Sequence, residues 1–335
     1  MRFLKFFIKF VLLPVAVICI VLYFASWRVF SQDITYGVSF SKLHADELGV
    51  DWKAAYQAAL YDLDIKHFRL SAHWPMIEPR DDAFSFEEMD YQISEAEKAG
   101  ADVILAVGLR TPGWPECHRP EWTLDMERSV LQEKQLSYVR EVVNRYKDSP
   151  ALKYWQVENE AFLHFATQYC EDIDVDFFKK EIALVKELDP AHPIMITDSG
   201  EFGRWYKAYR LGDVFATSQY LYVWYNPFGP IRYPIGPGLF TLKRNLMEWF
   251  FGEKPAILSE LGLEPWLSKP IKDASLEEQF ALMNEERFDE AIRFGRKTSF
   301  TEQYLWGVEW WYYLKEKHNR PEIWEKARGL YYQNP

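Results

Sequence analysis

The sequence predicts an α/β protein whose main domain is a (β/α)8 TIM barrel. After the first 32 residues, short apolar runs alternate with helical patterns along the chain, and such alternation is typical of a parallel sheet covered by helices. There are eight apolar runs, which is the strand number of a closed barrel. The predicted strands are Ile34–Phe40, His67–Ser71, Asp102–Gly108, Leu152–Val157, Ile194–Thr197, Val214–Gln219, Ala256–Ser259 and Tyr304–Val308.

Helices are predicted between these runs, where apolar residues recur at three- and four-residue spacing and charged residues fill the other positions. Tyr225–Gly238 contains four Pro and three Gly, so we expect an irregular loop over the barrel mouth there. No repeat, linker or Gly-rich phosphate loop divides the chain, and residues 33–335 are interpreted as one domain. The clearest predicted helices are Trp52–Leu63, Phe86–Ala99, Ser129–Tyr146, Phe177–Leu188 and Leu276–Phe294.

An apolar segment precedes the barrel. Phe10–Trp27 contains no charged side chain, and three basic residues lie before it. A run of this length is at the short end of the roughly 17–25 residues that a transmembrane helix needs. We therefore predict that residues 1–32 form a short cytoplasmic stub followed by a membrane anchor, a transmembrane or signal-anchor helix.

A cleaved signal peptide is the alternative for the same segment. Val29 and Ser31 could supply a weak cleavage site, although the apolar run is long for a signal peptide and no A-x-A pattern follows it. Both interpretations place the barrel outside the cytoplasm, either anchored to the membrane or secreted.

Composition and charge exclude some classes of partner. The chain has 39 basic and 50 acidic side chains and a formal charge of −11. Nucleic-acid binding needs a basic stripe, and no Lys/Arg-rich block is present, so we expect no nucleic-acid partner. No H-E-x-x-H pattern or Cys/His cluster occurs, and we predict neither a metal nor another cofactor. Aromatic residues make up 17% of the chain, which suits stacking on sugar rings.

Two glutamates at strand ends are the first candidates for chemistry, because the active site of such a barrel lies at the C-terminal ends of its strands. The fourth apolar run continues into Asn159 and Glu160, and the seventh is followed by Glu260. The seventh strand comes three strands after the fourth, so the two carboxyl groups are expected to face each other across the barrel. One protonated and one ionised carboxyl group are what the cleavage of a glycosidic bond requires.

Further segments support a resemblance to a known group. They are Phe68-Arg69-Leu70 in the second strand with Ile77-Glu78-Pro79 after it, Thr111-Pro112-Gly113-Trp114 after the third strand, and Tyr304-Leu305-Trp306-Gly307 in the eighth. Together with the strand-end glutamates, these segments resemble the retaining glycoside hydrolases of the (β/α)8 clan GH-A, which includes cellulases, β-glycosidases and β-galactosidases. The likeness runs from about residue 34 to residue 313.

The resemblance implies a role for each residue around the two glutamates. Glu160 would be the acid/base and Glu260 the nucleophile that forms a glycosyl-enzyme intermediate. Arg69 would hydrogen-bond Glu260 and favour its ionised form. Asn159 would bind the sugar 2-hydroxyl, and Tyr220 would donate a hydrogen bond to the nucleophile. The competing interpretation is structural: an internal strut for Arg69, a loop cap for Asn159 and a core or rim position for Tyr220.

Three more side chains are candidates for substrate binding. Trp306 would form the floor under the sugar. Trp114 is a candidate because it belongs to the segment after strand three that resembles the same segment of these glycoside hydrolases. His73 would contact sugar hydroxyls or simply pack at the rim. Two departures leave the subfamily open: Ala161 stands where the group often has Pro, and Ser218 stands where some families have His before the strand-six Tyr.

Cys117 and Cys170 are a candidate disulfide pair. The third cysteine of the chain lies in the apolar N-terminal run, and disulfides persist outside the cytoplasm. The two cysteines follow adjacent strands, the third and the fourth, so a bridge would fasten the loop that carries the acid/base.

The sequence therefore predicts a retaining glycoside hydrolase that cleaves β-linked oligo- or polysaccharides. Two other functions stay open. One is a carbohydrate-binding barrel with little or no turnover. The other is a transglycosylase that passes the sugar to an acceptor alcohol and remodels cell-envelope glycan.

Overall fold

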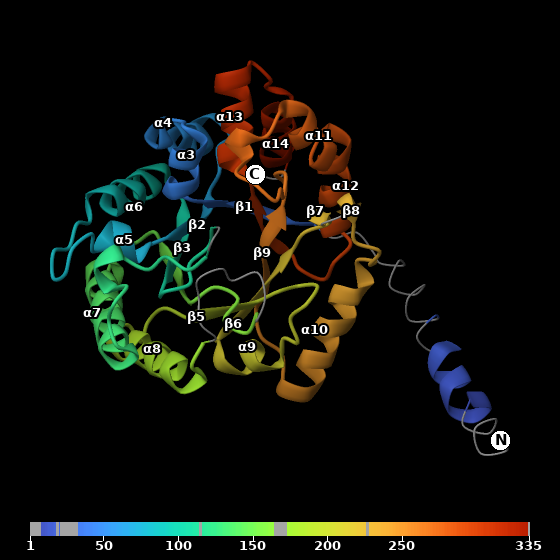
Figure 1. Cartoon of the computed structure of the whole chain (residues 1–335), viewed down its shortest axis with the longest axis horizontal. Helices are drawn as coiled ribbons and strands as arrows, with labels where there is room; N and C mark the ends of the chain where they lie inside the picture. The colour runs from blue at the N-terminus through green and yellow to red at the C-terminus, as the bar shows by residue number, and fades with distance from the viewer. Residues whose placement is uncertain are drawn as a thin grey trace.

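Eight parallel strands form a closed barrel at the centre of the molecule (Figure 1). The structure is a computed structural model that describes residues 8–17, 20, 33–113, 116–163, 173–225 and 228–333. Around the barrel the strands follow the order β1-β10-β9-β6-β5-β4-β3-β2. The predicted (β/α)8 fold is confirmed. The bounds are β1 (Thr35–Phe40), β2 (His67–Ser71), β3 (Asp102–Val107), β4 (Leu152–Val157), β5 (Ile194–Asp198), β6 (Val214–Gln219), β9 (Ala256–Gly262) and β10 (Glu302–Trp306).

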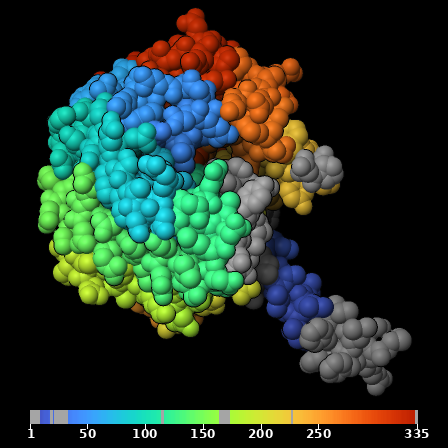
Figure 2. All heavy atoms as spheres, turned by 60° about the vertical axis from the view of Figure 1, so that its left-hand side comes forward, coloured from blue at the N-terminus to red at the C-terminus, as the bar shows by residue number. Residues whose placement is uncertain are grey.

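Helices cover the outside of the barrel (Figure 1), and those of the N-terminal half form a continuous outer surface in the space-filling view (Figure 2). The α-helices are α3 (Lys42–Leu48), α4 (Trp52–Gln57), α5 (Trp74–Ile77), α6 (Glu87–Ala99), α7 (Arg128–Tyr146), α8 (Val175–Leu188), α9 (Tyr206–Leu211), α10 (Gly238–Phe251), α11 (Leu276–Leu282), α12 (Glu285–Gly295), α13 (Val308–His318) and α14 (Glu322–Gln333). Short π and 3-10 turns are η1 (Ile8–Leu12), η2 (Ala58–Asp62), η3 (Glu121–Thr123) and η4 (Ile271–Asp273).

The core has two parts because both faces of a parallel barrel are buried. One lies between the strands and the surrounding helices and contains most of the buried apolar side chains. The other is a small cluster contributed by five different strands, as expected for side chains that fill a barrel interior. Its members are Ile104, Met195, Val214, Ala216, Ile257 and Tyr304.

Two predicted elements differ from the structure. The helix predicted at Leu276–Phe294 is broken between α11 and α12, where the Asn284 side chain accepts a hydrogen bond from Arg287 N and starts a new helix. The loop predicted at Tyr225–Gly238 was expected to be irregular throughout. Instead, β7 (Tyr222–Tyr225) and β8 (Gly229–Arg232) pair as an antiparallel hairpin, with Gly229 in the left-handed conformation that the turn region requires.

The predicted membrane anchor lies mostly outside the described residues. Within the described part of the chain, which includes residues 8–17 and 20 of this segment, no helix is long and apolar enough to cross a bilayer. Anchoring by residues 1–32 therefore stays a prediction.

Candidate active site

Glu260 is held by two donors at the mouth of the barrel. It lies in β9 and is buried. Its Oε1 accepts a hydrogen bond from Arg69 Nη1 at 2.6 Å, and its Oε2 accepts one from Tyr220 OH at 2.7 Å. Arg69 comes from β2 and Tyr220 follows β6, so three strands fix one carboxyl group. A positive charge and a hydroxyl are thus fixed beside a carboxyl group that has no freedom to turn away.

Gly262 makes room for Tyr220. A Cβ atom at residue 262 would lie 2.4 Å from Tyr220 Cδ1, closer than side-chain carbons approach each other. The Tyr220 ring also packs edge-on against Trp266, with ring centroids 4.5 Å apart. The glycine two residues after Glu260 therefore lets the tyrosine reach the carboxyl group.

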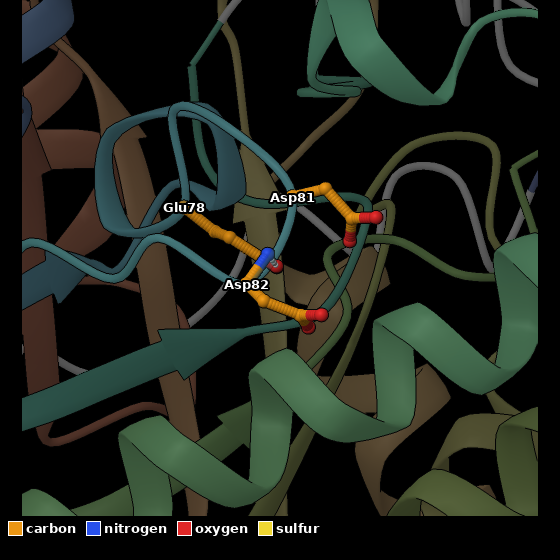
Figure 3. A group of neighbouring side chains, drawn as sticks. All are labelled: Glu78, Asp81 and Asp82. Carbon is orange, nitrogen blue, oxygen red and sulfur yellow. Dashed lines mark hydrogen bonds between the residues drawn. The ribbon is translucent and has the colours of Figure 1, made fainter.

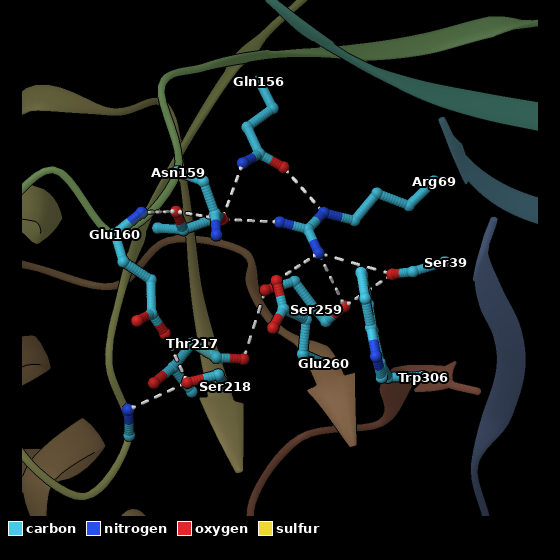
Figure 4. Close-up of polar contacts among 12 residues, drawn as sticks. Ser39, Arg69, Gln156, Asn159, Glu160, Thr217, Ser218, Ser259, Glu260 and Trp306 are labelled. Carbon is cyan, nitrogen blue, oxygen red and sulfur yellow. Dashed lines mark hydrogen bonds and ion pairs between the residues drawn. The ribbon is translucent and has the colours of Figure 1, made fainter. Parts of the chain in front are cut away.

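Arg69 connects Glu260 to the polar interior of the barrel (Figure 4). Its side chain is fully buried. Nε donates to Gln156 Oε1 at 2.7 Å, and Nη2 donates to Asn159 Oδ1 at 2.7 Å. Nη1 also reaches Ser39 Oγ at 3.3 Å. The planar guanidinium group of β2 thus binds side chains from β1, β9 and the end of β4 at the same time.

Replacing Arg69 by Met is expected to destabilise the protein. It would leave Glu260 buried without its cation and remove donors from Gln156 and Asn159, and breaking a buried pair from one side costs about 3–5 kcal/mol. Urea unfolding measures the change, with exposed Arg140→Met on α7 as the matched control, for which a change within about 0.5 kcal/mol is expected. Equal stability losses for the two variants would contradict this role of Arg69.

The two amide atoms of Asn159 differ in their hydrogen bonds within the described part of the chain. Besides Arg69, Oδ1 accepts from Gln156 Nε2 at 3.1 Å and from Thr197 Oγ1 at 3.2 Å. These donors settle which amide atom is oxygen. Nδ2 has no hydrogen-bond partner among the described residues, although Asn159 is only 1% exposed. A buried donor without a partner in a polar site is available to a ligand.

Glu160 lies in a different environment from Glu260. Its backbone N donates to Thr197 Oγ1 at 2.8 Å, and its Oε1 accepts a hydrogen bond from Ser218 Oγ. Burial raises the pKa of the Glu160 carboxyl well above its ordinary value, and the negative charges of Glu116 and Glu260 raise it further. These surroundings favour the protonated form of the Glu160 carboxyl group over its ionised form.

Ser218 lies next to both glutamates and shows that they belong to one site. In the β6–β9 ladder the register shifts between Thr217 and Ser218, so that Ser218 is paired with Glu260. The same residue donates to Glu160 (Figure 4). Glu160 and Glu260 thus come from strands on either side of Ser218 and lie at the same end of the barrel.

The backbone after β4 is unusual, with φ of 59° at Glu158 and 42° at Glu160. Non-glycine residues adopt this left-handed region rarely, and such conformations cluster at functional sites. Glu158 holds the segment in place, because its carboxylate accepts from Leu109 N at 2.8 Å and Arg110 N at 2.6 Å. The sharp change of direction presents Asn159 and Glu160 to the mouth of the barrel.

A cavity of about 490 Å³ lies over this arrangement, a size typical of pockets for small ligands. Glu260, Tyr220 and Trp306 line it. Trp306 Nε1 donates to Glu264 Oε1 at 2.7 Å, which fixes the indole ring against the cavity wall. Trp266, 39% exposed, lines the same cavity. Aromatic walls around polar groups suit a sugar ring, which has apolar faces and polar edges.

Three of the predicted site residues lie elsewhere or cannot be placed. His73 is buried, with Nδ1 2.7 Å from Thr111 Oγ1 and Nε2 3.3 Å from Ser41 Oγ. Both ring nitrogens thus have protein partners below the rim. Trp114 and Cys170 lie outside the described residues. Cys117 is disulfide-bonded, and its pairing with Cys170 stays a prediction.

Sequence reasoning missed several polar residues of the site. Gln156 and Ser39 point into the barrel, and their role depends on which face of each strand turns inward. Glu116 lies on the loop after β3 and lines the cavity with Glu260. An acidic residue in a loop after a strand was the one signal that could have identified it.

A group of three acidic side chains lies apart from these residues, directly after α5 (Figure 3). Glu78, Asp81 and Asp82 lie close enough to hold a cation. Glu78 accepts from Trp74 Nε1 at 2.7 Å and from Asp82 N at 2.9 Å, and Lys134 pairs with both aspartates. These contacts orient the carboxylates and place one ammonium group beside two of them, and we assign no metal to the group.

Comparison with known proteins relates the chain to glycoside hydrolases. The model of glycoside hydrolase family 42, described as β-galactosidase, matches residues 52–187. A mannan endo-1,4-β-mannosidase of Aspergillus fumigatus is 29% identical over 131 residues, which is 35% of this chain and 28% of that protein. A β-galactosidase of Halorubrum lacusprofundi is 28% identical over 152 residues, 38% of this chain and 21% of that protein. The chain thus spans less than a third of the length of these relatives.

Solved structures share the fold. A GH42 β-galactosidase, Gan42B, has a TM-score of 0.62 at 14% identity, covering 90% of this chain and 56% of that one. A GH5_18 protein of Streptomyces cattleya, solved with GlcNAc, has a TM-score of 0.55 at 15% identity, covering 83% of this chain and 71% of that one. The family match and the shared barrel relate this protein to the (β/α)8 glycoside hydrolases. The matched segment contains Arg69, Asn159 and Glu160, whereas Glu260 lies beyond it.

Proposed function

We propose that the protein is a retaining β-glycoside hydrolase in which Glu160 is the acid/base and Glu260 the nucleophile. The observation that carries the proposal is the contrast between the two carboxyl groups. Glu160 is buried with a raised pKa, and its carboxyl group accepts a hydrogen bond from the Ser218 hydroxyl, whereas Glu260 is paired with a guanidinium group. Such opposite environments are how one site holds both an acid and a nucleophile.

The geometry supports a double displacement. Glu260 Oε attacks the anomeric carbon while Glu160 donates its proton to the leaving glycosidic oxygen, so that a glycosyl ester forms and the alcohol departs. Glu160, now a carboxylate, then takes a proton from water, and the water oxygen displaces Glu260 from the same carbon. Two inversions return the original anomeric configuration.

The substrate class that fits is a β-linked oligo- or polysaccharide. The relatives are named for β-mannan and β-galactoside cleavage, and the cavity with Trp306 and Trp266 offers rings for stacking. Neither step of the mechanism requires a cofactor, because the protein supplies the proton, the nucleophile and the orienting charge.

The experiment is a panel of 4-nitrophenyl β-glycosides together with β-linked glucan, mannan, xylan and galactan. We expect turnover of at least one member and, by proton NMR of the first product, retention of the β-configuration. An α-configured first product would rule out the retaining mechanism. No turnover of any member would overturn the proposed activity in favour of a carbohydrate-binding barrel. A product formed on an added acceptor alcohol in preference to water would identify a transglycosylase.

We further propose that residues 1–32 anchor the barrel to a membrane and that the barrel lies outside the cytoplasm. The uncharged run at Phe10–Trp27 and the basic residues before it support this placement. The full chain should remain in the membrane fraction after carbonate washing and keep its N-terminal residues by mass spectrometry. A soluble product shortened to about residue 32 would instead indicate a cleaved signal peptide.

A further inference from the structure

A third carboxyl group, Glu116, lies beside the two candidate catalytic glutamates. It lines the cavity together with Glu260 and Tyr220. Its backbone φ is 65°, in the left-handed region, and its carbonyl oxygen accepts from Thr111 N at 3.0 Å. The next residue, Cys117, pairs with Arg110 in a β-bridge and is disulfide-bonded. The loop therefore fixes an acidic residue in a strained conformation at the cavity wall, which is typical of functional positions.

Glu116 and the neighbouring Asn159 each have one buried polar atom that lacks a hydrogen bond within the described part of the chain. Glu116 Oε2 and Asn159 Nδ2 are both inaccessible to solvent, and neither has a hydrogen-bond partner among the described residues. Burial and then the charge of Glu260 raise the pKa of the Glu116 carboxyl group to about 8, and the Asn159 side chain is near enough to lower it slightly. The free acceptor belongs to a residue that lines the cavity, and the free donor belongs to the neighbouring Asn159, directly before Glu160. Such atoms are rarely left unsatisfied in a functioning site.

We propose that Glu116 is a further substrate-binding residue, and that it and Asn159 together bind one hydroxyl group of the sugar; this inference rests on the proposed function. A hydroxyl satisfies both atoms, because its oxygen accepts from Asn159 Nδ2 while its hydrogen is donated to Glu116 Oε2. An ammonium group has no lone pair for Asn159. An acetamido nitrogen also has no available lone pair, so it cannot accept from Asn159 Nδ2 while donating to Glu116 Oε2.

The identity of the hydroxyl follows from Asn159. In the proposed function Asn159 binds the sugar 2-hydroxyl, so Glu116 makes the site select sugars with a free 2-hydroxyl over 2-deoxy sugars. Selection is strong where a buried polar group would otherwise stay unpaired. The contact also affects the acid/base Glu160. A sugar hydroxyl that donates to Glu116 favours the ionised form of Glu116. That negative charge raises the pKa of Glu160.

The test compares two substrates on matched variants of the full chain. We would measure kcat/KM for the 4-nitrophenyl β-glycoside that the wild type prefers and for its 2-deoxy analogue, with Glu116→Ala, Glu116→Gln and wild type. Glu121→Gln, an exposed glutamate on the same loop, is the control. Glu116→Ala should lower kcat/KM about 10- to 100-fold on the 2-hydroxy substrate, the loss expected of one hydrogen bond to a charged group. On the 2-deoxy substrate the loss should stay below about threefold.

Glu116→Gln adds a second readout. Its amide oxygen can still accept the hydroxyl, so the loss on the 2-hydroxy substrate should be smaller than for Ala. Without the charge at residue 116, the alkaline limb of the pH profile should move to lower pH in both variants. Equal losses on the two substrates, or no loss on either, would overturn the inference while leaving the proposed function intact. A wild type without any turnover would overturn the proposed function and this inference with it.

Discussion

Replacing Glu260 by Gln should lower kcat/KM by at least about 10⁴-fold, the size of effect seen when a nucleophile is removed from an enzyme that forms a covalent intermediate. The amide oxygen is a poor nucleophile and carries no charge, so the glycosyl ester does not form. Arg69 and Tyr220 would still hold the side chain in place through Nη1 and OH. Binding of substrate should therefore survive better than turnover, and kcat should fall far more than KM changes.

Chemical rescue makes the assignment of the nucleophile specific. In Glu260→Ala, the space left by the side chain can admit azide, which attacks the anomeric carbon from the face that Glu260 used while the aryl oxide leaves. The product should be the α-glycosyl azide, identified by proton NMR. Exposed Glu253→Gln, just before β9, is the control and should behave as wild type. Near-normal activity of Glu260→Gln, or a β-azide from Glu260→Ala, would remove Glu260 from this role.

The strand-end glutamates could be predicted from the sequence because all strands of a parallel barrel end at the same side, the mouth of the barrel. A residue at the end of an apolar run must lie at the mouth, whatever the details of packing. This rule places Glu160, Glu260 and Arg69 at the barrel mouth, because each lies in or next to a short apolar run. It also located all eight strands. Helices with mixed composition, such as α10, were not singled out because their apolar and polar residues are less regularly spaced.

Residues whose place depends on loop geometry or on exact register could not be predicted. Glu116 reaches the cavity only because its loop turns through a left-handed residue. Ser218 is paired with Glu260 because the β6–β9 register shifts just before it. Gln156 meets Arg69 inside the barrel, where strand tilt decides which side chains share a layer. A pattern of residue types contains none of this information, since it is set by long-range pairing.

Replacing Glu160 by Gln should lower kcat about 10²- to 10⁴-fold on substrates with poor leaving groups, the usual contribution of general acid–base catalysis. The loss should be smaller for a 2,4-dinitrophenyl glycoside, whose leaving oxygen needs little protonation. The raised pKa of Glu160 gives the sign of the pH dependence: the wild type is active while Glu160 is protonated and loses activity as pH rises through that pKa. Glu160→Gln should lose this alkaline limb.

Two variants of residues beside Glu160 should shift the alkaline limb of the pH profile in opposite directions. Ser218 donates to Glu160 and lowers its pKa, whereas the charge of Glu116 raises it. Ser218→Ala should therefore move the alkaline limb to higher pH, and Glu116→Gln should move it to lower pH, each with kcat/KM measured from pH 5 to 10 on one aryl glycoside. Azide added to Glu160→Ala should give the β-glycosyl azide, because it attacks the glycosyl ester on Glu260 from the face that water normally uses. An alkaline limb that survives in Glu160→Gln, or an α-azide from Glu160→Ala, would show that another group supplies the proton.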